Sequence, residues 1–534
     1  MKVKCFKIIL LALTIFMAIG ISACFSPLGY KGDGDTSISI RLGGGGAMAR
    51  SAVDPEALQY TLTFSGPGNR RVTESAGWGE TVVAKVVPGR WSISVRAFDP
   101  ADPNITRAVG EAYSIDVRAG AQNNVDIKMA VYWEVGSWAE LETAIATGEY
   151  DAFIAVTAPF DAGAMITTAA PGNPDRIFTL TSLGGPHTIS RTATGSLFTV
   201  GADTELILRD ITLEGSTGNN APLLRVNPDG KLTLRNGGRV TGNTYTTSVE
   251  HSGGAGIFMD GGNLEIAGGE ILNNTLNNSS ATHTWGGGIY AINSSSVLMT
   301  GGSISGNKIT SILSIPNNNG GGGIALINSC YFEMIDGVIE NNSVYSENTS
   351  GGLSAGASGG GVYIDLWQNN TNSSFYLRGG KIRNNVCSSK DAASYGFNAG
   401  GGVAIRGAFY MSGGIISGNS ISSSVNPNPS YQTNQDGSYG GGVGILAHVS
   451  STSIFEKTGG VIYGNDVEGY DNDNIPLKNT AHNDTDGWGC GHAVFFGNDV
   501  YGYAQKPRRN VTAWENDDLD GSIIGLDGGW ELAP

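Results

Sequence analysis

Cysteine is scarce in this chain, and the few cysteines do not form a framework. Five cysteines occur in 534 residues. Cys330, Cys387 and Cys490 lie far apart in the sequence, which excludes a disulfide-stapled scaffold and the closely spaced cysteine pairs of a structural zinc site. We therefore expect packing, rather than covalent cross-links, to hold the fold together.

Positive charge is also scarce. The chain carries 32 Lys and Arg residues against 48 Asp and Glu residues, a formal net charge of −16. A surface this acidic is repelled by phosphate backbones and anionic headgroups. Nucleic acids and anionic membrane surfaces are therefore not expected as partners.

Glycine, in contrast, is abundant: 81 glycines occur without the G-X-Y period of collagen, which indicates turns. Residues 286–307, GGGIYAINSSSVLMTGGSISGN, form a 22-residue unit that opens on glycines and closes on G-G-x-I-x-x-N. Similar units recur along the chain. Their closing asparagines are expected to stack in a hydrogen-bonded ladder, with ligand contact as the alternative: Asn243, Asn274, Asn307, Asn342, Asn385, Asn419 and Asn465.

Apolar residues alternate with polar ones inside each unit, as Ile289, Ala291, Val297 and Met299 illustrate. This period of two predicts three short strands per unit, separated by glycine, asparagine and serine turns. Repeated units bury their apolar faces against one another. The sequence therefore predicts a right-handed parallel β-helix of about 9–11 rungs. Its expected inward columns are Ile257, Ile289, Ile324, Val362, Val403 and Val443, and Leu264, Val297, Phe332, Phe375 and Phe409.

The G-G-[AG]-[IV] opening and the later I-x-x-N resemble the GGA[ILV]/FxxN repeats of the chlamydial polymorphic outer-membrane proteins and, more broadly, the pectin-lyase-like β-helices. The resemblance covers residues 197–498. Ile or Val stands where that family has Phe, and no translocator barrel follows the repeats. The resemblance thus implies a β-helix but not self-translocation.

Residues 1–23 have the pattern of a bacterial export signal, with three lysines before an apolar run. The segment ends Ile21-Ser22-Ala23-Cys24, which resembles a lipoprotein signal and implies cleavage before Cys24 and acylation of that residue. An ordinary signal peptide or a short membrane anchor is the alternative. With Phe25 next, the pattern resembles that of lipoproteins sent to the outer membrane. We expect a lipid-anchored envelope protein. The sequence is compatible with either the cell surface or the periplasmic side of the membrane.

The rest of the chain divides by its patterns. Six or seven short strands predict a β-sandwich resembling immunoglobulin-like or prealbumin-like spacer modules. Ser137 and Glu140 form a capping box that predicts a short helix near 137–147, suited to cap the first rung. The expected divisions are signal peptide 1–23, acylated tether 24–35, β-sandwich 36–131, N-terminal cap 132–175, and β-helix with a C-terminal cap 176–534.

The segments between each closing asparagine and the next glycine opening are rich in Ser, Asn, Thr, Gly and Tyr. If each leaves the rung at the same corner, they project as loops on one side, where Tyr, Ser and Asn suit recognition. Tolerated solvated insertions are the alternative. The candidate binding residues are Tyr345, Asn348, Tyr395, Phe397, Tyr431, Tyr439 and Tyr470.

Catalytic and metal signals are weak, and no cofactor is expected. Asp365 and Arg406 are predicted to lie one rung apart as a surface ion pair, which suits neither a lyase base nor a glycosidase pair. Asp484 and Asp486 resemble part of a calcium loop whose acidic end is missing. Lys457 stands where other units place an inward apolar residue, so either the register shifts there or a lysine is partly buried. A basic face that would meet an acidic sugar, or simply be solvated, comprises Arg378, Lys381, Arg383 and Arg406, beside Asp365.

Taken together, the patterns predict an envelope lipoprotein, resembling those of spirochaetes, that acts as an adhesin. It would bind a host-surface protein or a glycan through stacked corner loops. A polysaccharide lyase or glycoside hydrolase is the alternative from the enzyme class, and it rests on fold analogy alone. A purely structural envelope protein is the third.

Overall fold

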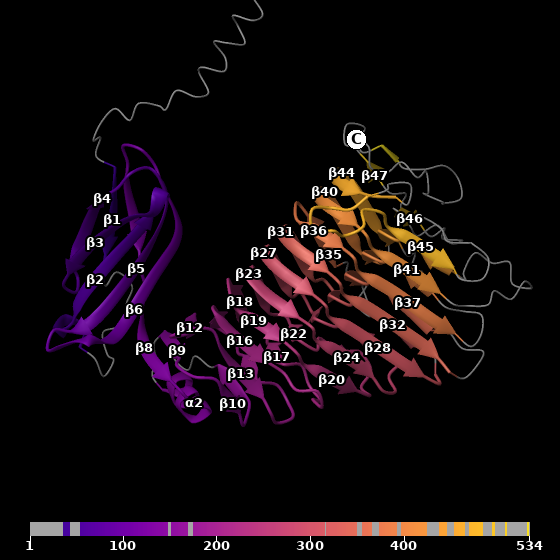
Figure 1. The fold of residues 1–534 in the computed structure, drawn as a ribbon, viewed down its shortest axis with the longest axis horizontal. Coiled ribbons are helices and arrows are strands. Elements are labelled where there is room, and N and C mark those ends of the chain that lie inside the picture. The colour runs from indigo at the N-terminus through magenta and orange to yellow at the C-terminus, as the bar shows by residue number, and fades with distance from the viewer. Residues whose placement is uncertain are drawn as a thin grey trace, which may run out of the picture. The chain divides into compact units, whose positions relative to one another are not determined.

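The computed structural model describes the following residues: 36–42, 54–147, 151–168, 175–315, 317–349, 355–365, 373–391, 397–423, 437–445, 453–464, 469–483, 494–496, 508–509 and 531–532. The chain forms two compact units, Met1–Ala130 and Val131–Pro534. Strands dominate both (Figure 1). The prediction of an all-β protein is therefore confirmed.

Unit 1 contains two groups of paired strands that share one apolar core. β1 lies between β4, its antiparallel neighbour, and β7, its parallel neighbour. An antiparallel set runs in the order β3-β2-β5-β6. Ile38, Phe64 and Trp91 lie in the common core. The bounds are β1 Ser37–Arg41, β2 Gln59–Gly66, β3 Arg70–Ala76, β4 Thr81–Lys85, β5 Gly89–Asp99, β6 Asp102–Val117 and β7 Gln122–Asp126, with 3-10 turns Pro55–Ala57 and Pro67–Asn69.

The predicted helix lies near the start of unit 2, directly after β8 (Met129–Val135). α2 (Trp138–Ala146) has Ser137 as its N-cap, whose hydroxyl accepts a hydrogen bond from Glu140 N at 3.4 Å. The Glu140 carboxylate accepts one from Gly136 N at 2.7 Å, one residue before the position a capping box uses. Trp138, Leu141, Ala144 and Ile145 share one face of the helix and are buried in the main core. α2 is nine residues long. No helix in the described part of the chain is long and apolar enough to cross a membrane.

The remaining strands of unit 2 pair in parallel and form four sheets. The ten-stranded sheet comprises β11 (Ile166–Thr168), β14 (Phe198–Val200), β17 (Leu224–Val226), β22 (Ile257–Asp260), β26 (Ile289–Ile292), β30 (Ile324–Ile327), β34 (Val362–Asp365), β39 (Val403–Ile405), β43 (Val443–Ile445) and β46 (Val494–Phe496). The seven-stranded sheet comprises β20 (Thr244–Thr247), β24 (Thr275–Asn278), β28 (Lys308–Leu313), β32 (Ser343–Asn348), β37 (Val386–Asp391), β41 (Ser420–Ser423) and β45 (Thr480–Asn483).

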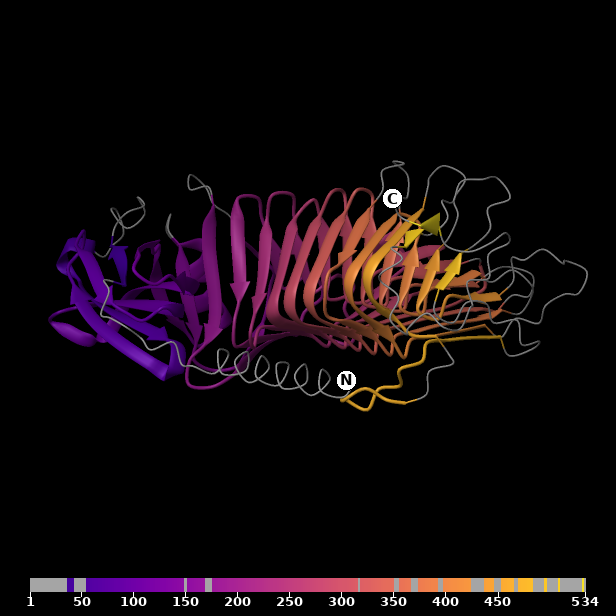
Figure 2. The same ribbon diagram turned by 90° about the horizontal axis from the view of Figure 1, so that it is seen from above.

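The six-stranded sheet comprises β21 (Ser252–Gly253), β25 (His283–Trp285), β29 (Asn317–Gly320), β33 (Ala355–Ser358), β38 (Phe397–Ala399) and β42 (Gly437–Tyr439). The fourth, called here the bent sheet, holds β8 (Met129–Val135), β9 (Ala152–Val156), β10 (Phe160–Ala162), β12 (Arg176–Ser182), β13 (His187–Arg191), β15 (Thr204–Leu208), β16 (Ile211–Glu214), β18 (Lys231–Arg235), β19 (Arg239–Thr241), β23 (Asn263–Leu272), β27 (Ser296–Ser305), β31 (Tyr331–Glu340), β35 (Ser374–Leu377), β36 (Lys381–Arg383), β40 (Ala408–Ser417), β44 (Ile454–Ile462), β47 (Arg508–Arg509) and β48 (Glu531–Leu532). Figure 2 shows the strands side by side.

Successive repeats pair in register, so equivalent residues form columns. The column from Ile257 to Val443 pairs at every step, and every member is fully buried. The second predicted column also pairs, and its rings stack from Phe332 to Phe455. Lys457 pairs with Met411 and is 1% exposed, so it is a buried lysine at the inward position, and the register shifts only after this pair, between Met411 and Ser412.

The closing asparagines form the predicted ladder. Asn307 donates from its backbone N and from Nδ2 to Asn342 Oδ1, at 2.9 and 3.0 Å. The same pair of bonds joins Asn385 to Asn419 and Asn419 to Asn479. Asn479 therefore takes the place predicted for Asn465, which lies outside the described residues.

The predicted unit of three strands is present, as in β34, β35 and β36, but the segments between units are not simply loops. Ladder asparagines are 33 residues apart from Asn274 to Asn307 and 43 apart from Asn342 to Asn385. Between each closing asparagine and the next glycine opening, the chain adds a strand to the seven-stranded sheet and then one to the six-stranded sheet. One inward position of the seven-stranded sheet is apolar, as Val344 is in β32, but the next two are polar, as Ser346 and Asn348 are, so the apolar alternation of these strands is weak.

Candidate functional site

Where the structure describes the predicted corner loops, they are largely strands. Tyr345 and Asn348 belong to β32, where the Tyr345 hydroxyl donates to Glu347 at 2.7 Å and Asn348 is 2% exposed. Phe397 begins β38 and Tyr439 ends β42. Tyr470 is 65% exposed and forms an isolated bridge with Pro476. Tyr345, Asn348, Phe397 and Tyr439 therefore lie in strands and do not project as loops.

Several predicted positions lie outside the described residues. These are the lipidation site Cys24 with residues 1–35, the loop residues Tyr395 and Tyr431, the calcium candidates Asp484 and Asp486, and most of the predicted C-terminal cap.

Asp365 and Arg406 are neighbours, but they do not form a surface pair. The Asp365 carboxylate lies 3.7 Å from Arg406 Nη1 and accepts a hydrogen bond from the Tyr363 hydroxyl at 2.6 Å. All three lie on the outer side of the ten-stranded sheet, where Trp285 of the six-stranded sheet stacks on Tyr363 at 5.0 Å. Burial lowers the pKa of Arg406, but the charges of Tyr363 and Asp365 outweigh it and leave the pKa raised. This charged pair is internal, so the predicted surface position is wrong.

The predicted basic face is also divided. Arg378 lies on the bent sheet and pairs with Glu333. Arg383, of which the side chain is 8% exposed, contacts Glu340 at 2.7 Å and Asp471 and Asp473 at 2.5 Å each. Each of these cations already has a carboxylate partner, and Arg406 belongs to a different sheet. The four cations therefore form no common site for an acidic sugar.

Residues 469–478 fold back over the bent sheet and are fastened by Arg383. We call this segment the clasp. Asp471 also accepts hydrogen bonds from the backbone N–H groups of Asp473 and Ile475, both at 2.9 Å. Burial raises the pKa of Asp471, but the Ile475 N–H and Arg383 outweigh it and hold the pKa below its ordinary value. Asp471 is thus ionised at neutral pH and binds the guanidinium as a carboxylate.

Replacing Arg383 by glutamine is expected to loosen the clasp. Hydrogen bonds to charged groups contribute about 1.5–3 kcal/mol, so the local opening equilibrium should rise by at least about tenfold. Hydrogen exchange at the Leu477 amide, which donates to Gly469 O at 3.1 Å, measures this opening. Arg378→Gln, at a half-exposed cation that pairs with Glu333 and lies over the Tyr376 ring rather than against the clasp, is the control and should leave that amide unchanged. Equal exchange in both variants would mean that Arg383 does not fasten the clasp.

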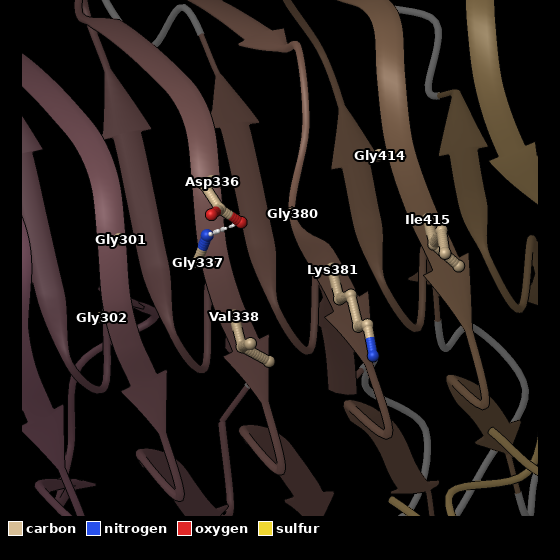
Figure 3. Close-up of a pocket in the computed structure, with 9 residues that line it drawn as sticks. All are labelled: Gly301, Gly302, Asp336, Gly337, Val338, Gly380, Lys381, Gly414 and Ile415. Carbon is tan, nitrogen blue, oxygen red and sulfur yellow. Dashed lines mark hydrogen bonds between the residues drawn. The ribbon is translucent and has the colours of Figure 1, made fainter. Parts of the chain in front are cut away.

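A shallow groove of about 600 Å³ crosses the outer face of the bent sheet (Figure 3). Four consecutive repeats contribute to it, so it extends about 14 Å across strands spaced about 4.8 Å apart. Its floor is mostly glycine. The lining residues are Gly301, Gly302, Asp336, Gly337, Val338, Gly380, Lys381, Gly414 and Ile415.

The glycines create the groove because each strand bends there. The pairing of β23 with β27 and of β27 with β31 shifts register at this point, as a β-bulge does. Gly302 has φ +85°, and a Cβ there would lie 2.1 Å from Gly269 O. A Cβ on Gly301 would meet only ordinary contacts, the nearest at 3.7 Å. A groove without side chains on its floor lets a ligand approach the backbone.

The walls of the groove are nearly neutral. Val338, Lys381 and Ile415 occupy one register position on β31, β36 and β40, and their side chains form a row in Figure 3. Lys381 Nζ lies 3.7 Å from Asp471 and 3.6 Å from Asp473, so the clasp balances its charge. On the opposite side, Asp336 accepts a hydrogen bond from Gly337 N at 2.8 Å.

A row of tyrosines runs along the same outer face. Tyr376 and Tyr410 stack at 4.8 Å with an interplanar angle of 16°, and Tyr331 lies 5.2 Å from Tyr376. Tyr376 precedes the groove glycine Gly380 by four residues, about 13 Å along a strand. Burial raises the pKa of Tyr410, with Tyr376 and Glu456 adding to the effect, so its phenol keeps its proton and can donate. Tyr331 is exposed and donates its hydroxyl hydrogen to Glu333 at 2.9 Å, and Tyr376 and Tyr410 are partly exposed.

Sequence reasoning missed this surface although its signals were present. The G-G pair of each closing element indicates only a turn when it is taken alone, and tyrosines at outward positions of a strand do not by themselves indicate a surface row. Of the lining residues that the structure describes, Asp336 is the one carboxylate. General acid–base hydrolysis of a glycosidic bond uses two carboxyl groups, so this arrangement suits binding better than cleavage. Comparisons with protein-family models, with curated proteins and with solved structures find no match to this chain.

Proposed function

We propose that this protein is a cell-envelope protein that binds an extended, neutral glycan along the groove and the tyrosine row. The observation that carries the proposal is the coincidence of the two on one outer face, across consecutive repeats. Strands about 4.8 Å apart present equivalent groups at intervals close to the advance of one sugar in an extended glycan. A ligand with a repeating backbone matches a surface with a repeating backbone.

The chemistry of the surface favours neutral sugars. Tyrosine presents an apolar ring edge beside a hydroxyl, which suits the alternating C–H and O–H groups of a sugar. The one lysine of the groove is already paired with Asp471 and Asp473, and the chain is strongly acidic overall. A polyuronate would therefore be repelled.

The fold and location belong to the same proposal. The in-register parallel columns and their single buried core support a right-handed parallel β-helix, with the paired seven- and six-stranded sheets as an addition to each turn. The shared core of unit 1 supports a β-sandwich spacer. The Ile21–Cys24 sequence supports acylation at Cys24 and an outer-membrane anchor. Palmitate labelling that persists in Cys24→Ala would contradict the anchor, and surface proteolysis of intact cells would separate a surface protein from a periplasmic one.

Binding is tested by screening the full chain on a glycan array and titrating hits by calorimetry. Tyr376→Phe with Tyr410→Phe keeps the ring stack and removes two hydroxyls, so affinity should fall about tenfold, at about 0.5–1.5 kcal/mol per hydrogen bond. Gly301→Gln should obstruct the groove without a backbone clash and abolish binding.

Tyr470→Ala is the matched control, because this exposed tyrosine belongs to the corner-loop hypothesis rather than to the groove. It should bind as the unaltered protein does. Loss of binding in Tyr470→Ala, with full binding in the groove variants, would overturn the groove in favour of the loops. Release of shortened or unsaturated sugars from a bound glycan would instead make the protein an enzyme.

A further inference from the structure

Glu250, His251 and His283 come together at one edge of the six-stranded sheet, away from the groove. One ligand atom from each lies within 4.8 Å of those of the other two. We propose that these three side chains bind a zinc ion. The site is independent of the glycan proposal, because none of its residues lines the groove or belongs to the tyrosine row.

Parallel register brings the two histidines together. Ser252 of β21 pairs with Thr284 of β25, which places His251 beside His283 one residue earlier. The backbone N of His251 donates to His283 O at 3.1 Å, and the two rings lie 5.4 Å apart. His251 has φ +56°, a left-handed turn that few side chains adopt. The imidazoles are therefore held as neighbours by the backbone of successive repeats.

Glu250 is held across the same turn. Its carboxylate accepts hydrogen bonds from the backbone N–H groups of Thr282 and His283, the second at 3.1 Å. Oε2 lies 3.6 Å from His283 Nδ1, and the Thr282 hydroxyl lies 2.8 Å from that nitrogen. These bonds orient the carboxylate toward the imidazoles in the way that outer partners orient metal ligands.

Two imidazole nitrogens and one carboxylate oxygen favour zinc over calcium or magnesium, which prefer all-oxygen sites. In a tetrahedral site with bonds of about 2.1 Å, ligand atoms lie about 3.4 Å apart. The present separations require only rotamer adjustments, and the Glu250 side chain is 43% exposed. Three protein ligands at a solvent-accessible edge leave the fourth position for water. The ion would then join two successive repeats.

The alternative is that the cluster is only a Glu250–His283 ion pair beside a stacked imidazole. Calorimetric titration of the EDTA-treated full chain with ZnCl₂ distinguishes the two. We expect Glu250→Gln, His251→Gln and His283→Gln each to lower the affinity of one zinc equivalent by more than about tenfold, since losing even an outer partner costs that much. His187→Gln, which changes a histidine elsewhere, should retain that equivalent.

Three further measurements complete the test. Circular dichroism of each variant without zinc should match the unaltered chain, and Glu250→Gln is the safest substitution because its side chain is largely at the surface. Zinc should raise the melting temperature of the unaltered protein but not that of the three variants. Substituting CoCl₂ should give the visible absorption of tetrahedral cobalt. Equal zinc binding in the unaltered chain and the three variants, or equal displacement by CaCl₂, would overturn the proposal.

Discussion

Replacing Asn342 by alanine is expected to lower the free energy of unfolding of unit 2 by about 3–5 kcal/mol. The substitution leaves several buried polar groups without a hydrogen-bond partner, and each unpaired group costs about 1–3 kcal/mol. Asn342 is fully buried. Its Nδ2 donates to Ile304 O at 2.9 Å and to Asn385 Oδ1 at 3.0 Å, and its Oδ1 accepts from Asn307. Alanine can replace none of these bonds. Urea unfolding monitored by circular dichroism measures the loss.

The neighbouring Asn341 provides the control for this experiment. Asn341 is exposed and has φ +57°, a conformation that glycine adopts freely. Asn341→Gly should therefore change stability by less than about 0.5 kcal/mol, as most surface substitutions do. If Asn342→Ala were equally mild, the ladder would be a consequence of the stack rather than one of its supports.

Gly302→Ala should be the other strongly destabilising change, with a loss of about 2–5 kcal/mol. A left-handed conformation costs an L-residue about 1–2 kcal/mol, and overpacking adds about 1–3 kcal/mol. Here the added methyl would meet the Gly269 carbonyl of the preceding repeat, and a backbone atom cannot rotate away. Thermal melting and the yield of folded protein report the loss.

Gly301→Ala is a stringent comparison because it changes the adjacent residue by the same methyl group. Its Cβ would lie 3.7 Å from the nearest atom, an ordinary contact. Stability should stay within about 0.5 kcal/mol of the unaltered protein. Equal losses at both positions would show that glycine is needed along the groove for a reason other than backbone approach.

Both effects are large for the same reason. A stacked repeat contacts only its neighbours, so a defect in one repeat weakens the interfaces on both sides. The asparagine side chains and the bend glycines lie where the backbones of adjacent repeats meet. Because these positions are buried between repeats, an unpaired polar group cannot reach water there, and an added methyl group cannot move out into solvent.

Much of the candidate site could not be predicted from the sequence. The tyrosine row depends on Tyr376 and Tyr410 standing at equivalent positions of strands that pair across different repeats. Asp365 and Arg406 were correctly placed as neighbours, yet hydropathy could not show that Trp285 and the six-stranded sheet cover them. The histidine pair depends on the pairing of β21 with β25. These segments are polar, so their sequence does not predict that they form paired strands.

The sequence by itself determined the columns of the main core, the asparagine ladder and the capped helix. Each of these follows from local spacing: alternation sets the buried face, and a repeated asparagine or glycine recurs at one position of every repeat. Only the tertiary structure decided that the polar segments are strands, which charges are buried, and where a groove opens. Those features depend on which surface covers which, and the strands involved bury Ser and Asn beside a single apolar column, so their alternation is weaker than that of the main core.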